Sequence, residues 1–471
     1  GRRMAKPMPK HPNLKGNFAP IGMECDAPDL IVHGEIPQEL RGTYYRNGPD
    51  PQFAPRGQHH WFAGDGMIHA FHIEDGRCAY LNRWVRTKKW ELEHAAHESL
   101  FAPFDPMNSD PSVAGVDSTL ANTNIVWHGG RLLALEEGHA PFELDPVTLA
   151  SKGEWTFDDA LVGPMTAHPK LDPETGEMLF FGYMADGPFT PGIRYHVVGA
   201  DGRLTRSDHF EAPFASMVHD FVTTAEHVIF PIFPLTGSME RAMVGAPPFA
   251  WEPDKGTHIG IMGRDEACSA LRWFEHDPCY VFHPMNAWTE GEKVFADVMK
   301  YEQAPLFPNP DGSPGDPDKS EAKLVRWEFD LAANSGAVKE TQLDDLSGEF
   351  PRLDERRTGL SYRHGWYGCA EPGKRLPAFD TIGHVDHASG TRRLRRFAAG
   401  DGVSEPIFVP RTPDAAEGDG FVLALVYRAA ENRSDLLILD AQAIDAEPLA
   451  RIEIPVRVPY GFHGNWRPAS A

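Results

Sequence analysis

Four histidines beside apolar segments could together bind a metal ion. His168, His219, His283 and His463 lie in TAHPK, SMVHDFV, YVFHPMNAW and YGFHGNW, and they are separated by 51, 64 and 180 residues. Imidazoles that converge from separate strands form a neutral cage, which suits a divalent transition metal better than calcium or magnesium, whose ligands are oxygens. Iron(II), zinc, copper and nickel all fit this donor set. An average histidine is more often hydrogen-bonded or solvated than a ligand, so the fold must bring these four together.

Two glutamates divide the longest interval between these histidines. Glu349 in SGEFPRLD and Glu405 in VSEPIFVP complete the series 168, 219, 283, 349, 405 and 463, with a mean step of about 59 residues. A carboxylate that accepts the second ring N–H of a ligand histidine fixes the tautomer and orientation of the ring. Glu137, at the end of the apolar segment LLALEE, is a third candidate for this role, and a solvated strand end is the alternative.

The elements that must position these residues are short strands. Glycine (44) and proline (42) are spread along the whole chain and interrupt long helices. Asp-Pro-x-Thr and Asp-Gly turns, typical of antiparallel hairpins, separate several apolar runs of strand length. These runs are 130–137, 177–184, 227–234, 257–262, 279–284, 293–299, 323–331, 420–427 and 435–440. The predicted fold class is therefore all-β, with short helices or covering loops at 88–104 and 236–248 and a surface loop at 302–320.

The step of about 59 residues matches the four strands and loops of a large propeller blade. Since the inner strand of each blade lines a central channel, one marked residue per blade would face a common axis. Six marked positions span 168–463, and the residues before them leave room for one further blade. We predict a flexible N-terminal segment at 1–20 and a single seven-bladed β-propeller at 21–471, with a cap of loops and short helices over the metal centre.

Charge and cysteine usage exclude several classes of protein. The 45 Lys and Arg against 68 Asp and Glu give a net charge of −23, which would repel nucleic acid and anionic membranes. The five cysteines, without a C-x-x-C pair, fit neither a disulfide framework nor a thiolate zinc site. The N-terminus lacks the apolar segment of a signal peptide, and no run approaches the length of a membrane span. We therefore expect a cytoplasmic protein.

Dispersed motifs that occur in a characteristic order resemble those of the carotenoid cleavage oxygenase family. They are YYRNGPDPQF, FAGDGMIHAFHIEDG, TAHPKLDPETGE, HDF, FHPMNAW, RWEFDL, EFPRLD, EPIFVPR, EGDGFVLALVY and RSDLLILD. They extend from about Gly34 to Trp466. The sequence is most similar to the bacterial branch that cleaves lignostilbenes, isoeugenol and related aryl alkenes.

The resemblance implies a seven-bladed propeller with one non-haem Fe(II) per chain. The ion would be held by the four histidines, with Glu137, Glu349 and Glu405 as outer carboxylates and one imidazole left without such a partner. The family splits a conjugated C=C bond with O2 and yields two carbonyl products without an organic cofactor. No G-x-G-x-x-G or P-loop pattern is present, which agrees.

The expected partners are thus O2 and a small apolar or aromatic alkene, either an aryl alkene of the stilbene or phenylpropanoid type or an apocarotenoid. Weak membrane contact, through LFAPF (100–104) or MVGAPPFAW (243–251), is expected only for a carotenoid substrate. The sequence does not determine the oligomeric state. The alternatives are a metal-dependent propeller hydrolase or lactonase and a propeller that serves only as a binding platform; neither explains the four-histidine series.

Two positions depart from the pattern of the phenol-cleaving branch. A lysine and a tyrosine of that branch anchor the 4-hydroxyl of the substrate, and the matching residues here are Glu136 and Phe104, with Phe101 as an alternative match for the tyrosine. Binding of an ordinary lignostilbene should therefore be weakened. Glu136 could instead accept a hydrogen bond from a phenol or alcohol, or face solvent.

Other residues are candidates for the substrate and oxygen pocket. Thr123 in LANTNIV is expected near an open position on the iron, although an ordinary strand threonine is the alternative. The candidates for the apolar wall are Phe62, Phe101, Phe104 and Phe233, against the alternative that they belong to the core.

Overall fold

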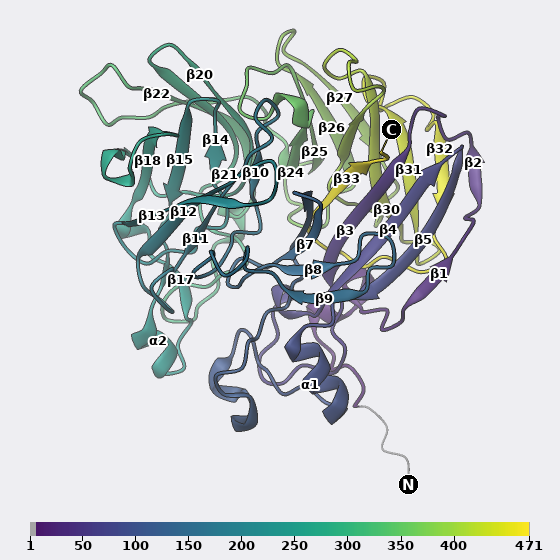
Figure 1. Cartoon of the computed structure of the whole chain (residues 1–471), viewed down its shortest axis with the longest axis horizontal. Coiled ribbons are helices and arrows are strands. Elements are labelled where there is room, and N and C mark those ends of the chain that lie inside the picture. Colours follow the sequence, from purple (N-terminus) through teal and green to yellow (C-terminus); the bar gives the residue numbers. More distant parts are fainter. Residues whose placement is uncertain (1–5, 471) are drawn as a thin grey trace.

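The computed structural model describes residues 6–470, and its sheets form the seven blades of a β-propeller (Figure 1). This confirms the predicted all-β class and the number of blades. All nine apolar runs that we assigned to strands coincide with strands. Several strands, such as β11 (Met178–Tyr183), are buried at every position, because neighbouring blades cover both faces of the sheet.

Five blades have four antiparallel strands in chain order. From the axis outwards they are β6 (Asn124–His128), β7 (Arg131–Leu135), β8 (Phe142–Leu144) and β9 (Ser151–Glu154); β10 (Lys170–Leu171), β11, β12 (Gly192–Val198) and β13 (Leu204–Glu211); β14 (Val222–Thr223), β15 (His227–Ile232), β18 (Thr257–Gly263) and β19 (Arg272–His276); β20 (Tyr280–Glu290), β21 (Lys293–Tyr301), β22 (Lys323–Asp330) and β23 (Lys339–Gln342); and β24 (Ser347–Leu353), β25 (His364–Ala370), β26 (Thr381–Asp386) and β27 (Thr391–Arg396).

The other two blades combine strands from both ends of the chain. One contains β28 (Gly402–Val403) and β29 (Ile407–Pro410), both paired with β30 (Gly420–Arg428), then β31 (Arg433–Asp440), β32 (Ala450–Glu453) and β2 (Val32–Gly34). The other has the order β33 (Gly464–Pro468), β3 (Gly42–Pro49), β4 (Gly66–Glu74), β5 (Arg77–Trp84) and β1 (Cys25–Ala27). Each of the two sheets thus joins an N-terminal strand to a C-terminal one, which closes the ring.

Both α-helices lie outside the blades. Helices α1 (Lys88–Ala96) and α2 (Met239–Met243) are found in the lower part of the view in Figure 1, α2 to the left of α1. The small hairpin of β16 (Leu235–Gly237) and β17 (Phe249–Trp251) flanks α2 along the chain. The predicted helices within 88–104 and 236–248 are confirmed, and 302–320 is a loop apart from the 3-10 turn η8 (Pro317–Lys319).

The segment before the propeller contacts its body. Residues 6–20 contain the 3-10 turns η1 (Pro12–Leu14) and η2 (Gly16–Phe18). Asn17 is buried; its side-chain oxygen accepts a hydrogen bond from Arg457, and its carbonyl accepts one from the backbone N–H of Tyr460. The flexibility of residues 1–20 remains a prediction, and residues 1–5 lie outside the described part. Within residues 6–470, no helix has the length and apolar character needed to cross a bilayer.

Candidate metal centre

The innermost strands of the seven blades each carry one marked residue at or near their start. Neighbouring innermost strands contact one another around the axis, from β14 through β20, β24, β29 and β33 to β6. The marked residues, in chain order, are Thr123, His168, His219, His283, Glu349, Glu405 and His463. The predicted arrangement of one residue per blade is confirmed, and Thr123 occupies the equivalent position in the seventh blade. Periodicity alone missed Thr123 because it carries no titratable group.

Four imidazoles meet where these strands converge. One nitrogen from each of the four buried histidines lies within 4.8 Å of the others. Nε2 of His219 lies 3.0 Å from Nε2 of His168 and 3.2 Å from Nε2 of His283. Two ligands at right angles around an ion, each about 2.1 Å from it, are about 3.0 Å apart. The spacing therefore fits a single transition-metal ion.

Three of the rings are oriented by a glutamate on the opposite nitrogen. Nδ1 of His219 is 2.6 Å from Glu137 Oε1, and Nδ1 of His283 is 2.6 Å from Glu349 Oε2. The third pair is His463 Nδ1 with Glu405 Oε2, at 2.7 Å. Because a carboxylate only accepts, each Nδ1 carries the proton and each Nε2 presents a lone pair to the centre.

The Nε2 lone pairs face one another, and this arrangement indicates whether the four residues suit a metal ion. Two neutral acceptor nitrogens 3.0 Å apart cannot hydrogen-bond to each other and would repel, and a cation between them removes the conflict. Burial lowers the pKa of His168, His283 and His463, which keeps these rings neutral, as ligation requires. At His219 burial acts in the same direction, but the carboxylates of Glu137 and Asp220 outweigh it and raise the pKa. The donor set therefore fits one iron ion held by four imidazoles.

His168 is the ring without a hydrogen-bonded carboxylate, as the resemblance implied. The carboxylate nearest to it is Asp220, whose Oδ2 lies 3.6 Å from Nδ1, beyond hydrogen-bond distance. Asp220 instead accepts a 2.8 Å hydrogen bond from Lys170 and a 2.7 Å hydrogen bond from the backbone N–H of Phe221. Neither Asp220 nor Lys170 was predicted, although Asp220 directly follows His219 and Lys170 is two residues after His168.

A further layer of contacts fixes the glutamates. The hydroxyl of Tyr183 donates to Glu137 at 2.5 Å, and that of Tyr301 donates to Glu349 at 2.9 Å. Arg352 donates a hydrogen bond to Glu405 at 2.9 Å. Burial opposes ionisation of the Glu405 carboxyl group, but His463 and Arg352 outweigh this effect and lower its pKa to about 2. No sequence pattern identified these partners, because each comes from a different strand than its glutamate.

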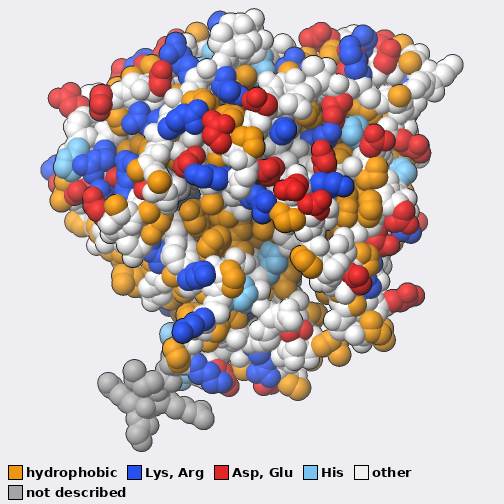
Figure 2. Space-filling model, turned by 180° about the vertical axis from the view of Figure 1, so that it is seen from behind, with side chains coloured by type: hydrophobic (Ala, Val, Ile, Leu, Met, Phe, Trp, Pro, Cys, Tyr) orange, Lys and Arg blue, Asp and Glu red, His pale blue; other side chains and the backbone are white. Residues whose placement is uncertain are grey.

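A cavity of about 1040 Å³ lies over the four-histidine cluster, and His219, His283 and His463 form part of its wall. The cap segments 103–107, 242–249 and 306–308 contribute to the wall as well, so the predicted cap is confirmed. Figure 2 shows apolar side chains in a hollow near the middle of one face, with histidine atoms beside it. On the same face, basic and acidic side chains are interspersed, so this face shows no continuous basic surface for nucleic acid.

Most of the predicted pocket residues line this cavity, namely Phe62, Phe104, Thr123 and Glu136. The rings of Phe62 and Phe104 pack edge to face with centroids 6.4 Å apart. Three further phenylalanines that were not predicted also line the cavity, and each adjoins a marked residue in the chain. Phe282 precedes His283, Phe350 follows Glu349, and Phe462 precedes His463.

Phe101 and Phe233 lie elsewhere than predicted. Phe101 is buried, and its backbone N–H donates to Glu93 of helix α1. Phe233 is buried in the core against Tyr280, with ring centroids 5.3 Å apart. Neither residue lines the cavity. A phenylalanine in an apolar strand has the same sequence signature in the core and at a cavity wall, which is why these two predictions failed.

Known proteins match the chain over almost its whole length. The profile of the family described as retinal pigment epithelial membrane protein, RPE65, matches residues 18–468. The isoeugenol monooxygenase of Pseudomonas nitroreducens is 41% identical over 99% of this chain and 100% of its own. The chain belongs to the carotenoid cleavage oxygenase family.

Other members of the carotenoid cleavage oxygenase family agree in sequence and in structure. The lignostilbene-α,β-dioxygenase isozyme III of Sphingomonas paucimobilis is 37% identical over 98% of each chain. The crystal structure of the lignostilbene dioxygenase of Pseudomonas brassicacearum superposes with a TM-score of 0.95 at 36% identity, covering 99% of this chain and 100% of that one. The resemblance inferred from the motifs is confirmed, including the bacterial branch.

Glu136, which departs from the phenol-anchoring pattern, has a charged partner in the structure. Glu136 forms an ion pair with Nδ1 of His139, and both residues line the cavity. Burial opposes protonation of His139, but Glu136 and then Asp117 outweigh it and raise its pKa to about 9. Nε2 of His139 also lies 3.2 Å from the hydroxyl of Ser118. The apolar cavity therefore has one polar corner with a net negative charge.

Glu349→Gln should retain iron but reduce activity about 10- to 100-fold, the range for loss of a partner behind a metal ligand. The side-chain amide can still accept from Nδ1 of His283 while its NH2 faces the hydroxyl of Tyr301, so the ring keeps its place but loses the carboxylate. Iron content and O2 uptake measure the two effects. Glu292→Gln, in the exposed β20–β21 turn, is the matched control. Full activity of Glu349→Gln would contradict the orienting role.

Proposed function

We propose that the protein uses O2 to cleave a conjugated C=C bond of an aryl alkene of the stilbene or phenylpropanoid type, or of an apocarotenoid, into two carbonyl products. The observation that carries this proposal is the convergence of four imidazole nitrogens at the wall of a largely apolar cavity. The relatives named isoeugenol monooxygenase and lignostilbene-α,β-dioxygenase support the aryl-alkene class.

The four histidines are the proposed ligands, and Glu137, Glu349 and Glu405 are proposed to orient three of them. Iron(II) bound there would supply the electrons and the binding position that activation of O2 requires. Since all four ligands are neutral, the ion would keep its full positive charge. The carboxylates hold the Nδ1 protons and keep the rings fixed while the reaction proceeds.

The aromatic wall is proposed to hold the alkene and exclude water. Phe62 packs against Phe282 and Phe462 with ring centroids 6.3 and 5.4 Å away, and Phe350 stacks on the ring of His283. Rings in edge-to-face and stacked arrangements offer the same geometries to an aryl group of the substrate. Holding the double bond beside the ligand histidines turns an encounter in solution into a reaction between fixed partners. Thr123, also at this wall, is proposed to limit access to the ion.

We further propose that the polar corner at Glu136 and His139 binds a hydroxyl group at one end of the substrate. One Glu136 oxygen is paired with His139, and the other accepts a single long hydrogen bond, of 3.3 Å, from the backbone N–H of Gly138, so this oxygen retains capacity to accept. A neutral phenol or alcohol can donate to that oxygen. A carboxylate on the substrate would be repelled, because Asp117, Glu136 and protonated His139 sum to one negative charge.

Glu136→Gln should lower kcat/KM for a 4-hydroxyaryl alkene by roughly 10- to 100-fold, because a hydrogen bond to a charged group contributes about 1.5–3 kcal/mol. The 4-methoxy analogue has no donor and serves as the internal control; its kcat/KM should change little. Steady-state kinetics with the pair of substrates measures the effect. An equal loss for both substrates would contradict a role in hydroxyl recognition.

The reaction class is tested on protein purified without oxygen. We expect about one iron per chain, O2 uptake equal to alkene loss, and two carbonyl products by mass spectrometry. Turnover with zinc and without O2 would instead support the metal-dependent hydrolase, and a lack of turnover on stilbenes, isoeugenol, 4-vinylphenols and apocarotenals would support the binding platform. Product labelling from 18O2 distinguishes one incorporated oxygen atom from two.

The free state of all five cysteines supports the proposed reducing cytoplasm.

A further inference from the structure

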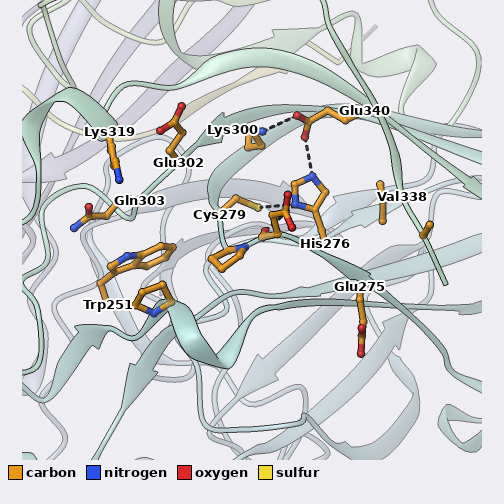
Figure 3. A pocket seen from close by; sticks show the side chains of 14 residues that line it. Trp251, Glu275, His276, Cys279, Lys300, Glu302, Gln303, Lys319, Val338 and Glu340 are labelled. Atoms are coloured by element: carbon orange, nitrogen blue, oxygen red, sulfur yellow. Dashed lines mark hydrogen bonds and ion pairs between the residues drawn. The ribbon is translucent and has the colours of Figure 1, made fainter.

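A second cavity, of about 720 Å³, lies apart from the four histidines and shares no lining residue with the first. Its wall contains a thiol, an imidazole, a carboxylate and an ammonium group, each in contact with the next, from Cys279, His276, Glu340 and Lys300 (Figure 3). His276 lies on β19, the outermost strand of one blade, whereas Lys300 and Glu340 lie on β21 and β23 of another blade, and Cys279 lies in the turn that precedes β20. The proposed oxygenase reaction uses none of them.

The hydrogen-bond partners of His276 require both ring nitrogens to carry protons. Nδ1 is 2.8 Å from the carbonyl oxygen of Asp277, and Nε2 is 2.9 Å from Oε1 of Glu340. A carbonyl and a carboxylate can only accept, so both nitrogens donate and the ring is an imidazolium. Consistently, although burial opposes protonation, contacts with Cys279 and Glu340 raise the pKa of His276 to about 10.

Glu340 is held in its charged form. It accepts hydrogen bonds from Lys300 at 2.6 Å and from the indole N–H of Trp327 at 2.7 Å, in addition to the one from His276. Burial opposes ionisation, but His276 and Lys300 outweigh it and lower the pKa of Glu340 to about 2. A fixed carboxylate behind an imidazolium stabilises the charge on the ring, as in thiol–imidazole pairs of known reactivity.

The sulfur of Cys279 faces this imidazolium. Sγ is 3.7 Å from Nδ1 of His276 and 3.7 Å from the hydroxyl of Thr257. The Thr257 oxygen accepts from the backbone N–H of Cys279, so its own proton is free to donate to sulfur. The sulfur therefore has two polar neighbours, an imidazolium ring and a hydroxyl group.

The other cysteines provide a contrast within the same chain. Burial raises the pKa of Cys78, Cys268 and Cys369 to about 12, which makes them unreactive at neutral pH. Cys25 is half-buried, so solvent reaches it. Cys279 is only 1% exposed, yet it lines the second cavity, so only a small reagent can reach it.

We propose that the second cavity is a thiol-modification site, in which the Cys279 thiolate, paired with the His276 imidazolium, bonds covalently to small, uncharged α,β-unsaturated carbonyl compounds. A sulfur electron pair forms the S–C bond at the β-carbon, and the C=C electron pair moves onto the carbonyl as an enolate. His276 then donates a proton to the α-carbon and recovers one from water. Atoms and electrons balance without an oxidant, and no group leaves.

Other charged groups share this cavity and bear on any pH dependence. They are Glu275, Asp277, Lys300, Glu302, Lys319 and Glu340. Of these, the structure places Glu340 and the Asp277 carbonyl directly on His276, and Lys300 on Glu340. With His276 protonated and Cys279 as a thiolate, the charged groups of the cavity sum to two negative charges, so the cavity disfavours an anionic reagent and accepts an uncharged one.

The test treats the whole native protein with acrylamide, a small neutral reagent of the proposed class, and measures alkylation of each cysteine by peptide mass spectrometry from pH 6 to pH 9. At pH 6 an ordinary thiol of pKa about 8.5 is less than about 1% thiolate. We expect Cys279 to react at least about 10-fold faster than Cys25 at pH 6, with a rate that changes little up to pH 8, while the rate of Cys25 rises steeply.

His276→Gln removes the cation and should slow alkylation of Cys279 at pH 6 at least about 10-fold, giving it the pH profile of an ordinary thiol. His258→Gln, on the adjacent strand β18, is the matched control and should leave the rate unchanged. Failure of Cys279 to react at any pH, or a rate that rises with pH in parallel with Cys25, would overturn the proposal. If His276→Gln does not fold, the pH dependence of the alkylation rate of Cys279 in the native protein is sufficient to test the proposal. Cys279→Ser should keep full iron content, which separates this site from the metal centre.

Discussion

His283→Ala should remain folded but lose its iron and with it the alkene-cleaving activity. The ring supplies one of four nitrogens that lie within 4.8 Å of one another, and no other described side chain is positioned to replace it. Losing an outer partner costs about 10- to 100-fold in metal affinity or activity, and losing the ligand itself should exceed that range. Glu349 keeps its hydrogen bonds from Tyr301 and from the backbone N–H of Phe350, so it is not left unpaired in the core.

Iron content per chain, O2 uptake and circular dichroism together test this expectation. A matched control is His196→Ala, because His196 is also fully buried but pairs with the hydroxyl of Ser207 away from the cluster. The control should keep its iron. Full iron occupancy in His283→Ala would show that His283 is not a ligand and would contradict an iron site made of four histidines.

Arg352→Met should destabilise the fold by about 3–5 kcal/mol, the range for removing one partner of a buried ion pair. Arg352 donates to Glu405 at 2.9 Å and to the carbonyl oxygen of Gly464 at 2.7 Å. It thereby ties β24 to β33 in another blade and to the glutamate that orients His463. Without it, the carboxylate of Glu405, only 4% exposed, loses its cationic partner.

The measurement is urea unfolding of the iron-free protein, so that loss of the metal does not add to the change in the free energy of unfolding. Arg357→Met is the control, because that arginine is 46% exposed and lies 3.9 Å from Glu417, a geometry that contributes little. A change below about 1 kcal/mol in Arg352→Met would show that the pair between blades is not structural.

The sequence alone was sufficient for the scaffold and for the residues that approach its axis. Strand-length apolar runs between turns determine an all-β chain, and the spacing of about 59 residues places one marked residue on each inner strand. Both are local signals, which repeat along the chain and need no knowledge of how blades pack. The four histidines, Glu349 and Glu405 were identifiable for that reason, whereas Glu137 was identified by its place at the end of an apolar strand.

Only the tertiary structure determined the partners that lie across blades. Tyr183, Tyr301 and Arg352 contact glutamates 46, 48 and 53 residues away, and no pattern within one strand encodes such a contact. The ion pair between Glu136 and His139 is short in sequence, yet its place at the cavity wall depends on the cap. Phe104 lines the cavity while Phe233 lies in the core, although both are apolar in sequence. Burial can be predicted from hydrophobicity, but which side of a packed blade faces a ligand is decided by the arrangement of its neighbours in space.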